Sequence, residues 1–171
     1  MATYLIIGNI FSFLASLCTA VSVVKRCKAD FMYWQVGNTI CAILTNFVLL
    51  SYSGVTTNSV SLIRNILAWK NKLTVKRTFL LLFCSVSLGV LYNNIGWIGL
   101  LPVFSSAGYT VCIYLTKNEQ PLRYALIVDL SVWAGYYLYI QAYPSVLTYM
   151  ILNVWTGIQI YKNRPKKCRQ D

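Results

Sequence analysis

The chain has 171 residues, of which 57% are hydrophobic and 11% are charged, and its formal net charge is +11. A soluble domain has about 45–50% apolar residues, so the composition excludes an ordinary soluble domain and favours a membrane protein. The charge would suit nucleic-acid binding, but Lys and Arg lie in short segments between apolar runs, which excludes a continuous basic face.

Seven apolar runs follow one another, separated by short polar turns, and about 20 residues suffice for a helix to cross a bilayer. The runs are Tyr4 to Val24, Phe31 to Leu50, Val55 to Trp69, Thr78 to Tyr92, Ile95 to Thr116, Leu122 to Ile140 and Ser145 to Tyr161. The third run is the least hydrophobic. Basic residues follow the first run and none precede it, so we expect a retained span and not a cleaved signal peptide. The sequence thus predicts an all-α membrane protein with seven transmembrane helices.

The basic residues predict the orientation of these helices. The segments after the first, third, fifth and seventh runs hold every Lys and Arg except Arg64 and Arg123, and Arg123 marks the turn at the very start of the sixth run. Lys and Arg collect in the cytoplasmic loops of membrane proteins. We therefore expect the N-terminus outside and the C-terminus in the cytosol, and only a count of seven spans satisfies the rule throughout.

A weak internal repeat has an offset of 92 residues. At this offset Lys70-Asn71-Lys72 recurs as Lys162-Asn163-Arg164, and Lys25 matches Lys117. Three spans are an odd number, so two parallel copies need an inverting span between them. The predicted parts are a first three-helix repeat (1–77), a linker helix (78–94), a second repeat (95–161) and a basic cytosolic tail (162–171). A coincidence between two basic helix ends is the alternative.

Polar residues recur at helical spacing in two of the runs. Asn58, Ser61 and Arg64 share one face of the third run, and Asn153 and Thr156 share one face of the seventh. At the offset of 92, Ser61 corresponds to Asn153 and Arg64 to Thr156. These two stripes predict a solute pocket near the membrane midplane, between the repeats. Hydrogen bonds that only tie helices together are the other interpretation.

Asp129 is the sole acidic residue well inside a run, and both it and Arg64 lie about 10 Å below the predicted cytoplasmic surface, at about 1.5 Å per residue. An ion pair between them, proton coupling through Asp129 and a snorkelling Arg64 all stay open. Trp133 lies one turn beyond Asp129, and Asn38 lies at similar depth in the second run. An aromatic ring beside polar groups suits a sugar or a nucleoside, and it equally suits ordinary packing.

Signatures of catalysis and of metal binding are missing from the sequence. The chain has no histidine, and its six cysteines include no C-x-x-C pair. It has no carboxylate pair, no glycine-rich phosphate loop and no G-x-S-x-G motif. We expect no enzyme activity, no cofactor and no metal site.

Three short motifs carry a resemblance to a known family. Leu100-Leu101-Pro102-Val103, Ser61-Leu62-Ile63-Arg64, and Leu152-Asn153 before a basic tail resemble the bacterial inner-membrane YgjV family over most of the chain. That family is grouped with the SWEET, PQ-loop and PnuC-type carriers of small solutes, which share a three-plus-one-plus-three architecture. The resemblance implies a multi-pass protein of the bacterial inner (plasma) membrane.

The comparison with sugar carriers of the SWEET type also implies site residues. In those carriers an asparagine on span 3 and another on span 7 hold the solute, between tryptophans on spans 2 and 6. Asn153 matches the second asparagine, and the first corresponds to Ser61 or Asn58. Trp133 is a loose match on span 6, whereas the Pro-Gln signature of PQ-loop proteins is absent.

Two functions follow as hypotheses. The first is a membrane carrier or facilitator for a small polar solute (a sugar, a nucleoside or a vitamin-like molecule) that works by alternating access at the repeat interface. The second is a non-transporting accessory or interaction protein of the membrane. The expected partners are the lipid bilayer and the solute, without nucleic acid, and the sequence is compatible with a homo-oligomer.

Overall fold

The computed structural model describes residues 2–116, 118–139 and 143–162, so Lys117 and most of the expected tail (163–171) lie outside the described residues. The described part is all-helical, without a strand. Its helices are α1 (Ala2–Val24), α2 (Lys28–Val48), α3 (Tyr52–Trp69), α4 (Val75–Leu91), the 3-10 turn η1 (Gly96–Leu100), α5 (Leu101–Leu115), α6 (Glu119–Tyr139) and α7 (Tyr143–Lys162). The predicted helix count is confirmed.

Some helix boundaries differ from the predicted runs. The second helix begins at Lys28, three residues before the run that starts at Phe31, and the fifth begins with a 3-10 turn that leads into Leu101. The fifth helix has Pro102 in its first turn, where a missing backbone N–H costs nothing. Apolarity alone did not show these ends, because basic and turn residues also adopt helical backbone there.

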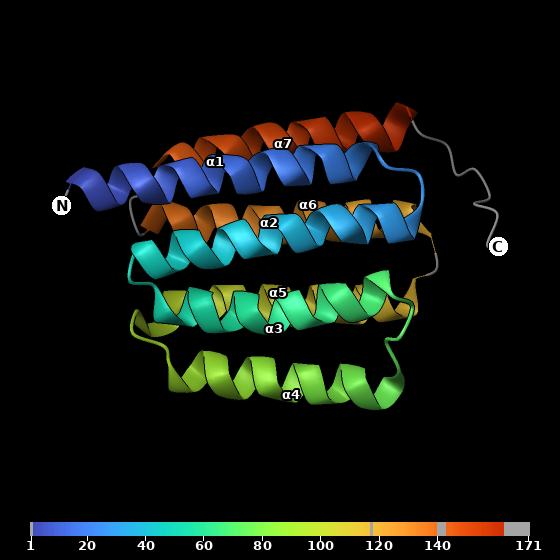
Figure 1. Cartoon of the computed structure of the whole chain (residues 1–171), viewed down its shortest axis with the longest axis horizontal. Helices are drawn as coiled ribbons and strands as arrows, with labels where there is room; N and C mark the ends of the chain where they lie inside the picture. The colour runs from blue at the N-terminus through green and yellow to red at the C-terminus, as the bar shows by residue number, and fades with distance from the viewer. Residues whose placement is uncertain (1, 117, 140–142, 163–171) are drawn as a thin grey trace.

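The helices form two layers. Figure 1 shows α1, α2 and α3 side by side in one layer, with α7, α6 and α5 behind them and α4 at one edge. Contacts of α1 with α7 and of α3 with α5 join the layers at both sides, and α4 packs on α3 and α5. Six helices therefore form a closed ring in which α2 and α6 face each other, while α4 lies outside the ring.

Polar residues turn toward the middle of this ring. In α3, Asn58 and Asn65 are 7% and 1% exposed, whereas Ile63 is 53% exposed. The outer helix α4 presents Phe79 and Phe83, which are 71% and 64% exposed. Two segments of the described chain, Tyr4–Val24 and Gly96–Leu115, are long and apolar enough to cross a membrane, by length and composition. Of the other helices, α6 buries mainly apolar residues, among them Leu122, Leu126 and Leu130.

The basic residues gather at one end of the bundle. The α1–α2, α3–α4 and α5–α6 connections and the end of α7 all lie at the right of Figure 1. Every described Lys and Arg except Arg64 belongs to these connections or to the helix turns beside them. The connections at the opposite end contain no described basic residue.

Two basic side chains at this end cap helices of the other half of the chain. Lys28 Nζ in α2 donates to the carbonyl oxygens of Ile113 and Thr116 at the end of α5, at 2.9 and 2.7 Å. The fully buried Arg123 in α6 donates through Nε and Nη2 to two carbonyl oxygens at the end of α1, at 3.1 and 2.7 Å. The last carbonyls of a helix lack partners within it, and they carry partial negative charge. We call these contacts the reciprocal caps.

The ammonium group of the Lys28 cap is partly buried, which disfavours its charged form. Burial lowers the pKa of the Lys28 ammonium group, because a low-dielectric environment disfavours the charged form. Two carbonyl oxygens at the negative end of α5 act in the opposite sense by accepting hydrogen bonds from it. The cap therefore depends on the close packing of α2 against the end of α5.

Replacing Arg123 should destabilise the bundle. Arg123→Gln leaves the last carbonyls of α1 without their buried donors, and we expect a loss of about 2 kcal/mol in the free energy of unfolding. Thermal unfolding of the protein in detergent measures this as a lower melting temperature. Lys76→Gln, at an exposed position of the same end, is the matched control. Equal melting temperatures of the two variants would contradict the capping role.

Candidate functional site

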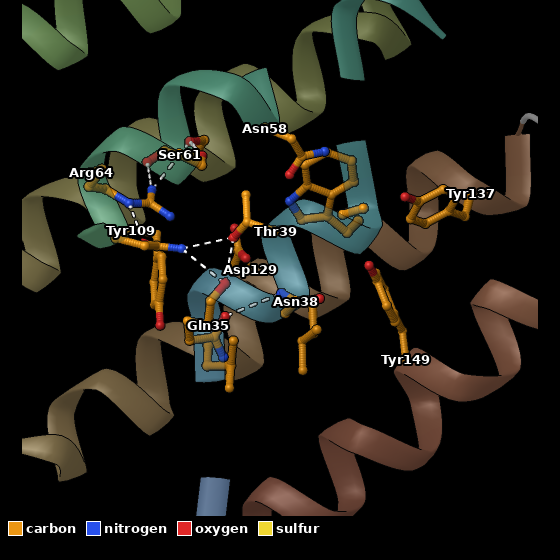
Figure 2. A pocket seen from close by; sticks show the side chains of 16 residues that line it. Gln35, Asn38, Thr39, Asn58, Ser61, Arg64, Tyr109, Asp129, Tyr137 and Tyr149 are labelled. Carbon is orange, nitrogen blue, oxygen red and sulfur yellow. Dashed lines mark hydrogen bonds between the residues drawn. The ribbon is translucent and has the colours of Figure 1, made fainter. Parts of the chain in front are cut away.

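A narrow polar cavity of about 40 Å³ lies between the two layers, in the middle of the ring (Figure 2). Residues of α2, α3, α5, α6 and α7 line it. Its polar residues other than tyrosine are Gln35, Asn38, Thr39, Asn58, Ser61, Arg64, Asn65, Ser106 and Asp129. One water takes up about 30 Å³ of liquid volume and needs polar partners. The cavity thus suits a water-sized occupant in this conformation.

Arg64 forms the α3 side of the cavity. It is 4% exposed. Its Nη1 donates to the Ser106 carbonyl oxygen and to Thr110 Oγ1 in α5, at 3.1 and 3.0 Å, while Nε donates to Asn65 Oδ1 at 3.0 Å. The guanidinium carbon lies 5.0 Å from the centroid of the Tyr109 ring, a cation–π contact. Nη2 has no hydrogen-bond partner among the described residues, and Figure 2 shows it directed toward the cavity.

An amide network forms the α2 wall. Asn65 Nδ2 donates to Thr39 Oγ1 at 2.9 Å, and Asn38 Nδ2 donates to Gln35 Oε1 at 3.2 Å. Gln35 Nε2 in turn donates to Ser22 Oγ in α1 at 2.9 Å. Satisfied buried networks of this kind hold side chains in fixed positions. The wall is therefore set by contacts among α1, α2 and α3.

Asp129 forms the α6 side. Its Oδ1 accepts a hydrogen bond from Ser105 Oγ in α5 at 2.5 Å, and the carboxylate also interacts with the Trp133 side chain. The same residue lines an apolar groove of about 390 Å³ between α5 and α6, beside Gly108 and Phe104. Asp129 thus separates the central cavity from a groove that opens on the outer face of the bundle.

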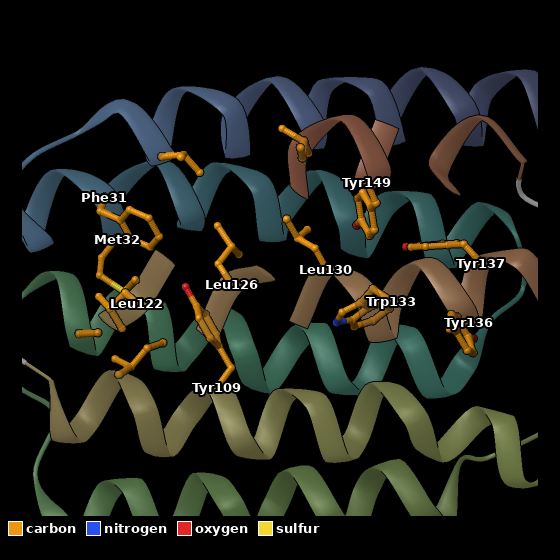
Figure 3. Packing of buried hydrophobic residues seen from close by; sticks show 14 residues of the cluster. Phe31, Met32, Tyr109, Leu122, Leu126, Leu130, Trp133, Tyr136, Tyr137 and Tyr149 are labelled. Carbon is orange, nitrogen blue, oxygen red and sulfur yellow. The ribbon is translucent and has the colours of Figure 1, made fainter. Parts of the chain in front are cut away.

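Apolar residues close the ring between the cavity and the basic end. Phe31, Met32, Ile113 and Leu122 are each 0% exposed and belong to one hydrophobic cluster (Figure 3). They come from α2, α5 and α6. We call these four residues the apolar plug. Since they offer no hydrogen-bonding side chains, a polar solute passes this level only if they move apart.

Aromatic residues close the ring at the opposite end. Trp133, Tyr136, Tyr137 and Tyr149 form a group in which neighbouring ring centroids lie 5.4 to 5.7 Å apart. We call them the aromatic cluster. Two hydrogen bonds attach it to the first layer, from Asn46 Nδ2 to Tyr137 Oη at 3.3 Å and between Ser51 Oγ and Tyr136 Oη.

Glycine is required where the first layer meets this cluster. A Cβ atom added to Gly54 at the start of α3 would lie 2.3 Å from Asn46 Oδ1 and 2.8 Å from Ser51 Oγ. Both of these side chains carry the hydrogen bonds to the tyrosines. The close approach of α2 and α3 at Gly54 therefore positions the groups that hold the aromatic cluster.

The structure brings six of the eight sequence-predicted site residues to the cavity. These are Asn38, Asn58, Ser61, Arg64, Asp129 and Trp133. Asn153 and Thr156 do not line it: Asn153 Nδ2 donates to Ser131 Oγ at 3.1 Å, and the fully buried Thr156 donates to the Leu152 carbonyl at 2.6 Å. Helical spacing gives a shared face, but it does not give the level at which that face meets a cavity.

Arg64 and Asp129 share the cavity without bonding each other. The hydrogen bonds of Arg64 go to Asn65, Ser106 and Thr110, and that of Asp129 comes from Ser105, so these described side chains form no direct ion pair. Arg64 does not snorkel to the bundle end either. Sequence reasoning missed the partners in α5, although small polar residues inside an apolar run are the signal that marks them.

Comparisons with known proteins agree with the membrane assignment. A family model described as a bacterial inner membrane protein, Imp-YgjV, matches residues 6–167. Neither a curated protein nor a solved structure matches the chain. A relation to the SWEET, PQ-loop or PnuC-type carriers therefore stays a prediction.

The position of Asp129 predicts a reagent-specific modification. Because Asp129 lines the apolar groove between α5 and α6, a hydrophobic carbodiimide should reach it from the lipid, and mass spectrometry should find the adduct. A water-soluble carbodiimide should instead modify Asp30, which is exposed at the basic end. Ser105→Ala removes the hydrogen bond to Asp129 and should increase its labelling. Labelling of Asp30 by both reagents, with none of Asp129, would exclude access through the groove.

Proposed function

The chain belongs to the Imp-YgjV family of bacterial inner membrane proteins, and from this premise we propose that it is a carrier or facilitator for a small polar solute. The observation that carries the proposal is the cavity between the two layers, in which a buried Arg64 and a partly buried Asp129 face a common space. Charged groups within a membrane are expensive and mark solute pathways.

The arrangement of helices supports two parallel repeats, α1–α3 and α5–α7, with α4 as the linker. In Figure 1, α1 and α5 run in the same direction from diagonally opposite corners of the ring, and so do α3 and α7. The reciprocal caps follow the same pairing, since α2 caps α5 and α6 caps α1. With the basic end in the cytosol, the N-terminus lies outside.

The size of the cavity implies that the solute binds in another conformation. Pockets for drug-sized ligands have about 300–1000 Å³, whereas this cavity has about 40 Å³. The two layers must therefore separate at one end to admit a solute. At the end opposite the basic residues, which faces outside in this orientation, opening requires the hydrogen bonds of Asn46 and Ser51 to the aromatic cluster to break. At the basic end, which faces the cytosol in this orientation, opening requires the four residues of the apolar plug to move apart and the hydrogen bonds of the reciprocal caps to break.

The small volume also favours one alternative function. A non-transporting accessory or interaction protein would use the buried hydrogen bonds only to join its helices, and its cavity would stay narrow at all times. The two functions differ in whether water and solute reach the level of Ser61, which donates to or accepts from Ser106 Oγ at 2.8 Å.

Cysteine labelling separates the two functions. In a background without the native cysteines, Ser61→Cys should react with a water-soluble thiol reagent if the protein is a carrier, because the cavity opens to water in turn at each end. Ser59→Cys, on the exposed outer face of the same helix, should stay unlabelled in lipid. Protection at both positions would indicate permanent packing and would contradict the carrier.

Transport itself is testable in liposomes. Purified protein should give saturable uptake of a solute from a panel of sugars, nucleosides, vitamins and amino acids. Ser61→Leu places apolar bulk in a cavity of about 40 Å³ and should lower the uptake rate at least tenfold, whereas Ser59→Leu on the lipid face should leave it near the wild-type value. Absence of saturable flux for every class would refute the proposed function.

A further inference from the structure

The charges around the cavity are balanced, which limits the solutes that it suits. Arg64 is the one basic and Asp129 the one acidic residue among those that line it. Burying an ion costs several kcal/mol unless an opposite charge and hydrogen bonds accompany it. A solute with a single charge would leave the loaded cavity with a net charge, and a net-neutral solute would not.

Both charged groups keep bonding capacity that faces the cavity. Arg64 uses Nε and Nη1 for contacts to α3 and α5 and leaves Nη2 without a partner among the described residues. Asp129 accepts a hydrogen bond from Ser105 and interacts with Trp133, whereas a carboxylate has about four acceptor sites. Their other bonds go to α3 and α5, so each group is held in place while part of it remains available to a solute.

A solute without charged groups does not explain the presence of Arg64 and Asp129. Sugars bind to amides and hydroxyls, and the cavity already holds Asn38, Asn58 and Ser61, which cost far less to bury than ions. Hydrogen bonds that involve a charged group are roughly twice as strong as those between neutral groups. A cation and an anion on opposite sides of one narrow space fit a solute that carries both charges itself.

We propose that the solute is a small zwitterion, such as a short-chain amino acid, whose carboxylate binds Arg64 Nη2 and whose ammonium group binds Asp129. The indole of Trp133 also interacts with the Asp129 carboxylate and so helps to hold this group in place. This assignment rests on the proposed carrier function and names its substrate class.

Four small probes test the charge requirement. L-alanine carries both charges, propionate only the negative one, ethylammonium only the positive one, and lactamide neither. Proteoliposomes loaded with unlabelled zwitterion should take up radiolabelled glycine, L-alanine or L-proline by exchange. Excess alanine should inhibit this uptake, whereas propionate, ethylammonium and lactamide should inhibit it at least tenfold more weakly.

Variants separate binding of the two charges from structural support. Asp129→Asn and Arg64→Gln should each reduce zwitterion uptake at least tenfold, and Arg64→Lys, which keeps the charge, should restore part of it. In each variant, alanine should lose more of its ability to protect Ser61→Cys against labelling than lactamide does. A merely structural role would weaken both probes equally, and melting temperatures in detergent identify variants that do not fold.

The outcomes distinguish the two levels of the proposal. Uptake of a sugar or nucleoside without uptake of any zwitterion would overturn the substrate class and leave the carrier function intact. Absence of saturable uptake for every probe and solute would overturn both. Equal inhibition of zwitterion uptake by alanine and lactamide would show that the charges of Arg64 and Asp129 do not select the solute.

Discussion

Hydrocarbon offers no hydrogen-bond partner to a polar side chain, and in a family of bacterial inner membrane proteins this constraint accounts for the buried position of many polar side chains in the bundle. Residues such as Asn46, Thr57 and Asn65 are at most 1% exposed, whereas Trp97 on the outside is 88% exposed. Polar side chains of α2 and α3 turn inward at the level of the cavity, while buried apolar and aromatic residues close the ring on either side of it. The charged cavity and the hydrogen bonds that hold its walls both follow from this inward placement of polar groups.

The ends of the ring obey the same constraint in different ways. At the basic end, the helix ends are packed against one another, so Lys28 and Arg123 supply the donors that buried carbonyls need. At the other end, tyrosine hydroxyls bond to Asn46 and Ser51. A carrier with one apolar and one hydrogen-bonded barrier would open its two ends at different energetic cost.

Local patterns predicted the parts of the structure that depend on local spacing. The apolar runs gave the helices, the three-residue spacing put Asn58, Ser61 and Arg64 on one buried face, and Asp129 and Trp133 share the cavity as expected. The partners of Arg64 in α5 lie 42 and 46 positions away. No periodicity in the sequence specifies such long-range pairings, so the bonds from Arg64 to α5 could not be predicted. For the same reason the sequence did not show that Asn153 and Thr156 lie away from the cavity.

The reciprocal caps bear on how a chain of this kind could have evolved from a shorter one. A half-length protein with helices like α1 to α3 would have its first helix capped only by a second copy, so it would be complete only as a two-fold dimer. If α1–α3 and α5–α7 are repeats, as proposed, a helix in the place of α4 keeps the two copies parallel. At the offset of 92, Arg64 aligns with Thr156 and Asp129 aligns with Gly37. A symmetric dimer would hold every charge twice, whereas in the single chain Arg64 and Asp129 each stand without a charged residue at the matched position.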